Sequence, residues 1–340
     1  MYEDDFNPSW WLKSGHVQTA MASLAIRRRH LRRRAAGMLE VARETLLDCG
    51  DGVRLHGLAS MHPGNAPRTL VILIHGWEGS SDSLYLLSCA SHLYNEGFDV
   101  FRLHLRDHGP SHHLNEGVFH SCRLDEAVQA VRVVCERYSP TKVCLAGFSL
   151  GGNFAARIAA QAPAAGLDLS MTIGVCPVLN PRHTLRALET GWPVYRFYFL
   201  RKWQRSLHLK AHYFPEQYRP ADFGSIKSLM QLTEYFVLEH SDFPDLETYF
   251  SGYALVGQTL EKLVQPTHLI LAEDDPIIPI EDLDLVATPP ALNITRTHHG
   301  GHCGYLDSLD GPSWADREIL RRLRAATAAG AEPYSDEAGA

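Results

Sequence analysis

The sequence predicts an α/β protein with a mostly parallel central sheet, helices on both of its faces and a helical insertion. Short continuous apolar runs alternate with amphipathic stretches, an order that produces a parallel sheet covered on both faces. The alternation is interrupted once, over residues 178–266, which is far longer than an ordinary connection. The chain of 340 residues is long enough for one such domain with an insertion.

The first half of the chain supplies a β-hairpin and then alternating strands and helices. Two short apolar runs flank the turn-forming stretch "DCGDGV", which is typical of a hairpin. The predicted strands are 42–47, 53–60, 69–76, 98–105, 142–148 and 170–177, and the predicted helices are 81–97, 121–138 and 151–162.

The alternation resumes after the insertion and completes the sheet. Strands are predicted at 267–275 and 292–302, and an amphipathic helix at 313–327. The chain end is small and polar, a composition typical of disorder. We therefore expect an N-terminal basic and aromatic extension (1–40), an α/β core (41–177 and 267–325), a cap insertion (178–266) and a disordered tail (326–340).

Composition narrows the class of protein. The hydrophobic share of 45% and the charged share of 21% are those of a globular protein, and a net charge of −7 argues against binding to bulk nucleic acid. The seven cysteines are scattered and form no C-x-x-C pair, which predicts free thiols in a reducing compartment. We see neither a secretory signal nor an apolar stretch of membrane-spanning length, so we expect a cytoplasmic protein.

The stretch "KVCLAGFSLGGNFAARIAA" places Ser149 between glycines, where a strand gives way to a helix. G-x-S-x-G in this context is typical of a nucleophile elbow, whose sharp turn exposes the serine hydroxyl. A serine that only caps the following helix is the alternative. Such a serine does not need a glycine on both sides, so we predict that Ser149 is a nucleophile.

A nucleophilic serine needs a base, and the base needs an orienting carboxylate. In this architecture the acid follows a later strand, and three acids follow the strand that ends "THLILA". We predict Asp275, because "DPIIP" puts an aspartate four residues before a proline, and keep Asp274 as the alternative.

The base is predicted in the glycine-rich stretch "THHGGHCGY" that follows the last strand. His302 lies on a loop free to reach the serine. His298 and His299 come earlier and are expected to make ordinary hydrogen bonds at the strand end.

The developing oxyanion needs two preorganised backbone donors. One is predicted to be the amide of Leu150, at the start of a helix whose dipole also helps. The other is the amide of Trp77, where Gly76 lets the chain turn. The Trp77 side chain either lines the acyl pocket or only packs.

Four pieces of sequence, taken in order, resemble the α/β-hydrolase superfamily and more narrowly its YheT-like branch of abhydrolase-domain esterases and lipases. They are "NPSWWLKSGHVQT", "HGWEGSSDS", "GFSLGGN", and "DDPIIP" followed by "HHGGHCGY". The resemblance implies an α/β-hydrolase fold and serine hydrolases of lipid-like or medium-chain esters, some also transferring acyl groups to alcohols. It maps the catalytic triad onto Ser149, Asp275 and His302.

The chain departs from the branch in two places. The loop "LRDHGPSHHLNEG" differs from the usual arginine-glycine-cysteine-glycine turn, and "VRLHGLAS" lacks an expected aspartate-tryptophan pair.

The predicted substrate is a small-molecule or lipid ester, bound without a cofactor or metal. The cap is expected to wall an apolar pocket above the serine, because such folds bind ligands at the carboxyl ends of their strands. The pocket residues predicted from the sequence are His75, Gly76, Trp77, Tyr195 and Phe199.

Several alternatives stay open or are disfavoured. An acyltransferase would use the same covalent step with an alcohol acceptor, and a non-catalytic binding protein would keep the fold alone. Dehalogenases and epoxide hydrolases share the fold but use aspartate at the elbow. A zinc site is disfavoured because the histidines, although numerous, lack the spacing of zinc ligands; they are His104, His108, His112, His113, His298, His299 and His302.

The run "RRRHLRRR", from Arg27 to Arg34, carries six arginines. It is expected either to pack as a solvated helix against the acidic body or to contact anionic membrane lipid, which would bring a lipid esterase to its substrate. Nucleic acid is the least compatible partner, given the net charge. The oligomeric state is left open.

Overall fold

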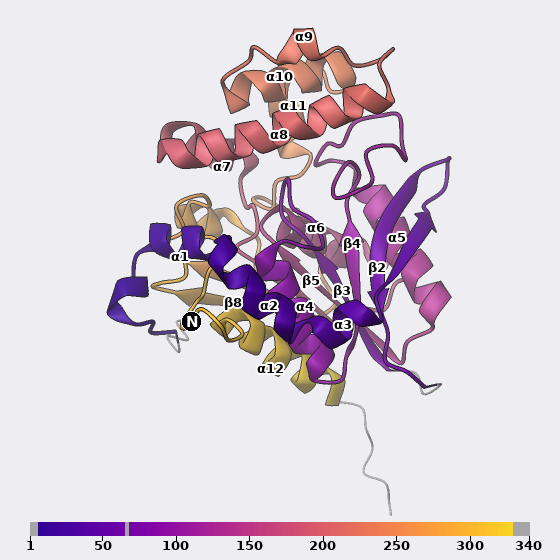
Figure 1. The fold of residues 1–340 in the computed structure, drawn as a ribbon, viewed down its shortest axis with the longest axis vertical. Helices are drawn as coiled ribbons and strands as arrows, with labels where there is room; N and C mark the ends of the chain where they lie inside the picture. Colours follow the sequence, from indigo (N-terminus) through magenta and orange to yellow (C-terminus); the bar gives the residue numbers. More distant parts are fainter. Residues whose placement is uncertain (1–5, 65–67, 329–340) are drawn as a thin grey trace, which may run out of the picture.

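The computed structural model describes residues 6–64 and 68–328 and has an eight-stranded sheet at its centre (Figure 1). The strand order is β1-β2-β4-β3-β5-β6-β7-β8. Only the pairs β1–β2 and β2–β4 are antiparallel, so the predicted hairpin forms one edge of a parallel sheet. The strands are β1 (Arg43–Asp48), β2 (Arg54–Ser60), β3 (Thr69–Ile74), β4 (Asp99–His104), β5 (Lys142–Phe148), β6 (Met171–Val175), β7 (Thr267–Ala272) and β8 (Leu292–Thr297).

Helices cover both faces of the sheet. On one face α6 (Leu150–Gln161) packs on β3, β5 and β6, and α5 (Leu124–Tyr138) packs on α6 and β1, within one apolar cluster. On the other face α4 (Leu84–Asn95) and α12 (Trp314–Ala328) do so, within a second apolar cluster. The alternation of strands and helices therefore produces the predicted α/β architecture, because each parallel strand is buried on both sides.

The N-terminal segment, residues 6–40, packs on the body of the protein rather than standing apart. It contains η1 (Trp10–Leu12), α1 (Gly15–Ala22), η2 (Ala25–Arg27), α2 (Arg28–Arg34) and α3 (Ala36–Glu40). Figure 1 shows α2 and α3 beside α4. Leu31 and Met38 are fully buried in the cluster that also holds α12.

This packing gives the arginines of the run at residues 27–34 different exposures to solvent. Arg27 is 2% exposed and donates to the carbonyls of Ala22 and Leu309. Arg34 donates to the backbone and hydroxyl of Ser88. The first and last arginines are therefore structural, and the run packs on the body of the protein through its two ends. The four between them are exposed and are Arg28, Arg29, Arg32 and Arg33.

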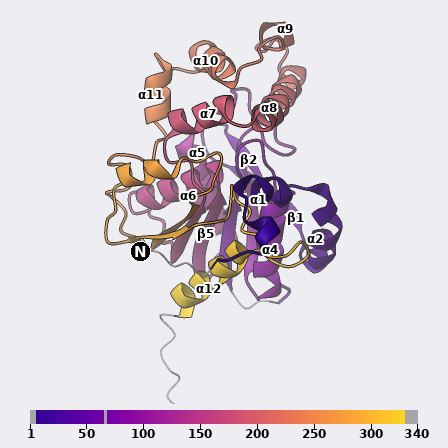
Figure 2. The same ribbon diagram turned by 90° about the vertical axis from the view of Figure 1, so that its left-hand side faces the viewer.

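The insertion forms a cap of helices over one end of the sheet (Figures 1 and 2). Its helices are α7 (Pro181–Thr190), α8 (Pro193–Tyr213), α9 (Pro220–Phe223), α10 (Leu229–His240) and α11 (Leu246–Ser251), and the short η3 (Ile280–Leu285) follows β7. None of the helices in residues 6–64 and 68–328 combines the length and apolar character needed to cross a membrane.

Several boundaries differ from the sequence prediction, and two of them lie near the end of the chain. The last strand ends at Thr297 instead of running to residue 302, because Gly300 and Gly301 have φ of +151° and +54°, which no strand accommodates. The final helix continues to Ala328, where Lys142 donates to the Thr327 carbonyl at 2.8 Å. Residues 326–328 are therefore helical, and the rest of the predicted tail, 329–340, lies outside the described residues.

Candidate active site

Ser149 sits at the turn between β5 and α6 with φ +55° and ψ −120°, a conformation rarely adopted by residues other than glycine. Its neighbours must be small for this turn to form. A Cβ on Gly147 would lie 2.0 Å from the Gly151 carbonyl oxygen, and one on Gly151 would lie 2.3 Å from the Ile74 carbonyl oxygen. The glycines thus let α6 begin directly against β5 and β3, and the serine is left at the tip.

His302 connects Ser149 to Asp275. Its Nε2 lies 2.8 Å from Ser149 Oγ, and its Nδ1 lies 2.9 Å from Asp275 Oδ2. The serine and histidine are 153 residues apart in the chain. The three side chains predicted from separate strand ends are therefore brought into one hydrogen-bonded chain.

The two neighbouring aspartates have different partners. Asp275 Oδ1 accepts from the amides of Ile277 and Ile278 at 2.8 and 3.0 Å, which leaves Oδ2 for the histidine. Asp274 instead accepts from the Gly301 amide at 2.8 Å and so fixes the loop that precedes His302. The structure places Asp275, rather than the alternative Asp274, on the imidazole.

The environment of His302 sets its proton affinity. Burial alone would lower the pKa, but the Asp275 carboxylate and the neighbouring Cys303 raise it, to about 9. An imidazole with raised basicity, hydrogen-bonded to a hydroxyl, is suited to accept the proton of that hydroxyl.

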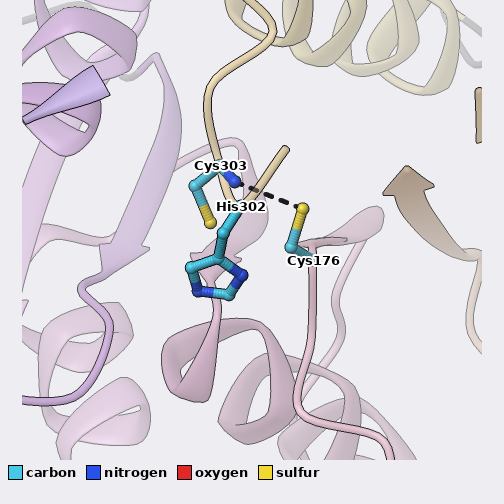
Figure 3. A group of neighbouring side chains, drawn as sticks. All are labelled: Cys176, His302 and Cys303. Atoms are coloured by element: carbon cyan, nitrogen blue, oxygen red, sulfur yellow. Dashed lines mark hydrogen bonds between the residues drawn. The ribbon is translucent and has the colours of Figure 1, made fainter. Parts of the chain in front are cut away.

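Two cysteines flank this histidine (Figure 3). The Cys303 amide donates to Cys176 Sγ at 3.4 Å, and Cys176, His302 and Cys303 form a group of side chains whose ligand atoms all lie within 4.8 Å of one another among the described residues. A metal ion held by all three would have to take a ring nitrogen of His302 from Ser149 or Asp275. All seven cysteines are free.

The predicted oxyanion donors lie on either side of Ser149. Leu150 is the first residue of α6, and its amide is one of those that the helix itself cannot satisfy. A Cβ on Gly76 would lie 3.1 Å from Ser149 Cβ, so the loop that carries Trp77 passes directly beside the serine.

Buried neutral histidines hold that loop. His104 Nε2 accepts from the Ser81 amide at 2.9 Å, and His108 Nε2 accepts from the Glu78 amide at 3.1 Å. Burial lowers the pKa of His104 to about 3 and that of His108 well below its usual value, so both rings are neutral acceptors at pH 7. Many of the chain's histidines are therefore structural.

His75 lines neither of the cavities that border Ser149 in the described part of the chain, which corrects one predicted pocket residue. It is fully buried, Nδ1 contacts the Gly76 carbonyl at 2.8 Å, and Nε2 accepts from the Leu105 amide at 3.2 Å. As the residue that follows the buried strand β3, it points into the layer beneath the loop. The other four predicted pocket residues line cavities beside Ser149; they are Gly76, Trp77, Tyr195 and Phe199.

Two cavities meet at Ser149. The smaller, of about 100 Å³, lies between the core and the cap and is walled mostly by apolar side chains such as Leu188, Trp203 and Phe236. The larger, of about 490 Å³, lies between the N-terminal segment and α8. The two share four lining residues, Trp77, Ser149, Phe199 and Ile277.

The N-terminal segment supports the histidine loop, a role that the sequence reasoning missed. Thr19 Oγ1 accepts from the His302 amide at 2.8 Å. The Gln18 side chain is fully buried and bonds both the amide and the carbonyl of Leu306. A Cβ on Gly15 would lie 1.9 Å from the Asp274 carbonyl oxygen, so only glycine permits this approach. The sequence signal for this role is the stretch "SGHVQT", which by itself predicts no contact with the histidine loop.

Residues 69–309 match the family of the alpha/beta hydrolase fold. The chain belongs to this family. Within it the chain lies in the YheT-like branch. YheT of Escherichia coli (strain K12), which carries a provisional esterase name, is 24% identical over 80% of this chain and 82% of its own length. A similarly named esterase of Synechocystis, slr0264, is 24% identical over 88% and 87%.

Solved structures agree in fold. The Pyrococcus furiosus esterase Pf2001 superposes with a TM-score of 0.54 at 15% identity, over 84% of this chain and 90% of its own. A 2,6-dihydroxy-pseudo-oxynicotine hydrolase superposes with a TM-score of 0.58 at 16% identity, over 93% and 78%. At these identities the likeness concerns the fold alone, and the chemistry must be argued from the site.

Proposed function

We propose that this protein is a serine hydrolase that cleaves carboxylic esters through an acyl-serine intermediate. One observation carries the proposal: the unbroken hydrogen-bonded chain from Ser149 Oγ through His302 to Asp275. The family and its esterase relatives support ester hydrolysis in general terms.

The first half-reaction forms the acyl-enzyme. His302 Nε2 takes the proton of Ser149 as Oγ attacks the ester carbonyl carbon, and Asp275 stabilises the imidazolium that results. The amides of Trp77 and Leu150 donate to the oxyanion. His302 then gives its proton to the departing alcohol as the ester C–O bond breaks.

The second half-reaction restores the enzyme. His302 takes a proton from water, the hydroxide attacks the acyl carbon, and the proton returns to Ser149 Oγ as the carboxylic acid leaves. Every step uses side chains and backbone groups of this chain with water as the second substrate.

The test is hydrolysis of p-nitrophenyl esters from acetate to palmitate by the wild type, Ser149→Ala and the control Ser139→Ala. Ser139 lies at the exposed end of α5, remote from the site. We expect Ser149→Ala to lose at least about 10⁴-fold in kcat while keeping its circular dichroism and Tm, and Ser139→Ala to match the wild type. A fluorophosphonate probe should label the wild type at Ser149.

A wild type that hydrolyses no ester and leaves Ser149 unlabelled would refute the proposal and favour a binding protein. Acyl transfer to an added alcohol in place of hydrolysis would assign the acyltransferase alternative.

A further inference from the structure

The position of His302 distinguishes the two cavities beside Ser149. It lines the larger cavity but not the smaller one, whereas Ser149 lines both and Leu150 lines only the smaller one. In the proposed mechanism the departing alcohol takes its proton from His302, so the alcohol part of the ester must lie on the histidine side of the serine. The acyl part then extends away from His302, into the smaller apolar cavity.

The cavity assigned to the alcohol carries positive charge. Apart from His302, its charged lining residues are Arg28, Lys202 and Asp82. Arg28 begins α2 and is exposed, and no carboxylate pairs with it among the described residues. Lys202, on α8, donates to the Glu78 carbonyl at 3.0 Å and lies over the Tyr198 ring at 4.9 Å, contacts that leave its charge uncancelled.

The acidic groups nearby compensate only part of this charge. Burial lowers the pKa of the Arg102 guanidinium, and Asp82 opposes that shift, so the Asp82 carboxylate interacts with Arg102 as well as with the cavity. Burial raises the pKa of Glu78, which faces Lys202, to about 8, which leaves that carboxyl mostly neutral at pH 7. Arg28, on the N-terminal segment, and Lys202, on the cap, therefore line the same cavity, and apart from His302 its one other charged lining residue among those described is Asp82.

We propose that the larger cavity binds the alcohol part of the ester, and that this part carries an anionic group, a phosphate or a carboxylate, held between Arg28 and Lys202. This rests on the proposed function and narrows it to a substrate class: esters with an apolar acyl group and a negatively charged alcohol. Both cations would favour an anion electrostatically and disfavour a cationic alcohol such as choline.

The experiment compares three butyrate esters that differ only in the alcohol: 1-butyrylglycerol 3-phosphate, monobutyrylglycerol and butyrylcholine. We expect kcat/KM to be about tenfold higher for the phosphate ester than for the neutral ester at low salt, and lowest for the choline ester. The preference should shrink at about 0.5 M salt, because exposed charges such as Arg28 are screened there.

Arg28→Gln should lower the phosphate-to-neutral ratio of kcat/KM about fivefold, as expected for one partly exposed ion pair. The matched control is Arg29→Gln, an exposed arginine of the same helix that lines neither cavity, which should keep the wild-type ratio. An unchanged ratio in Arg28→Gln, or equal turnover of the phosphate and neutral esters by the wild type, would overturn the inference.

Failure of the proposed function looks different, since then none of the three esters would be cleaved and Ser149 would not react with the fluorophosphonate probe. A second arm uses lysophosphatidic acid in neutral detergent micelles. With the preference for the soluble phosphate ester over the neutral ester established, a higher kcat/KM for lysophosphatidic acid than for that soluble ester would identify a lipid head group as the anion, and a lower one a soluble phosphate ester.

Discussion

The N-terminal segment (residues 6–40) and the cap (residues 178–266) both lie outside the sheet and both border the active-site cavities, but they attach in different ways. The N-terminal segment contacts the loop of His302 through backbone groups and two side chains, Thr19 and Gln18. The cap is joined through long side chains of α8 to the loop at 105–117, where Lys210 Nζ lies 2.8 Å from Asp107 Oδ1 and Ser206 contacts His112 at 2.7 Å.

The N-terminal segment and the cap therefore support the same reaction in different ways. Hydrogen bonds from the Thr19 and Gln18 side chains to the backbone of the histidine loop position the reacting imidazole, and catalysis depends on such positioning. The contacts between α8 and the loop at 105–117 instead hold one wall of the cavities in place. The loop at 105–117, which departs from the branch pattern, is where the cap docks. The departure therefore lies where the cap attaches, and His108 of the same loop also supports the loop that carries Trp77.

The largest expected effect is a loss of kcat on changing Asp275, at the end of the sheet that both regions border. Asp275→Asn should lower kcat about 10⁴-fold, because asparagine favours the wrong histidine tautomer. In the wild type, His302 acts as a base only when deprotonated, so kcat/KM should rise with pH and level off above its raised pKa of about 9. Removing the carboxylate charge should move this rise to lower pH, as a pH–rate profile would reveal.

Asp274→Asn is the matched control. It keeps an oxygen for the Gly301 amide and makes no contact with the imidazole, so we expect less than a tenfold loss and an unmoved pH profile. Equal losses in the two variants would contradict the assignment of Asp275.

The contacts that attach the cap should contribute to the free energy of unfolding. Lys210→Met leaves the buried Asp107 carboxylate without its cation and should cost about 3–5 kcal/mol in the free energy of unfolding, measured in urea. Asp107→Asn combined with Lys210→Met should recover much of this loss, because no unpaired charge remains. Lys262→Met, at an exposed position of the same insertion, should change stability by less than about 0.5 kcal/mol. A small loss in Lys210→Met would mean that apolar packing alone holds the cap.

The hydrogen bond between Thr19 and the His302 amide should affect kcat more than the free energy of unfolding. Thr19→Val is nearly isosteric but leaves the His302 amide without its acceptor, and it should lower kcat about 10- to 30-fold with little change in KM. Thr19→Ser keeps the acceptor and should restore most of the rate. If Thr19→Val and Thr19→Ser are equally active, the hydrogen bond does not position the histidine. Burst kinetics with a p-nitrophenyl ester would locate the loss in acylation.

Local pattern in the sequence determined the fold class, the elbow at Ser149 and the order of strands and helices, because each depends on neighbouring residues: apolar runs form strands, and glycines permit one sharp turn. Features that depend on residues far apart in the chain could not be predicted from such local patterns. The spacing before Pro279 favoured Asp275, but both aspartates follow β7, and only the fold sets which of them reaches His302. From its position at the end of a strand, His75 is expected to face the site. In the structure it is buried beside His104 and His108.

Only the tertiary structure decided what meets across long stretches of chain. Thr19 and the His302 amide are 283 residues apart, and nothing in either segment alone predicts their contact. Likewise Arg27 looks like its exposed neighbours until packing buries it, and Arg28 and Lys202 reach one cavity only because the N-terminal segment and the cap stand on either side of it. Sequence patterns report what a residue prefers locally, whereas a site's boundaries depend on which distant surfaces the core brings together.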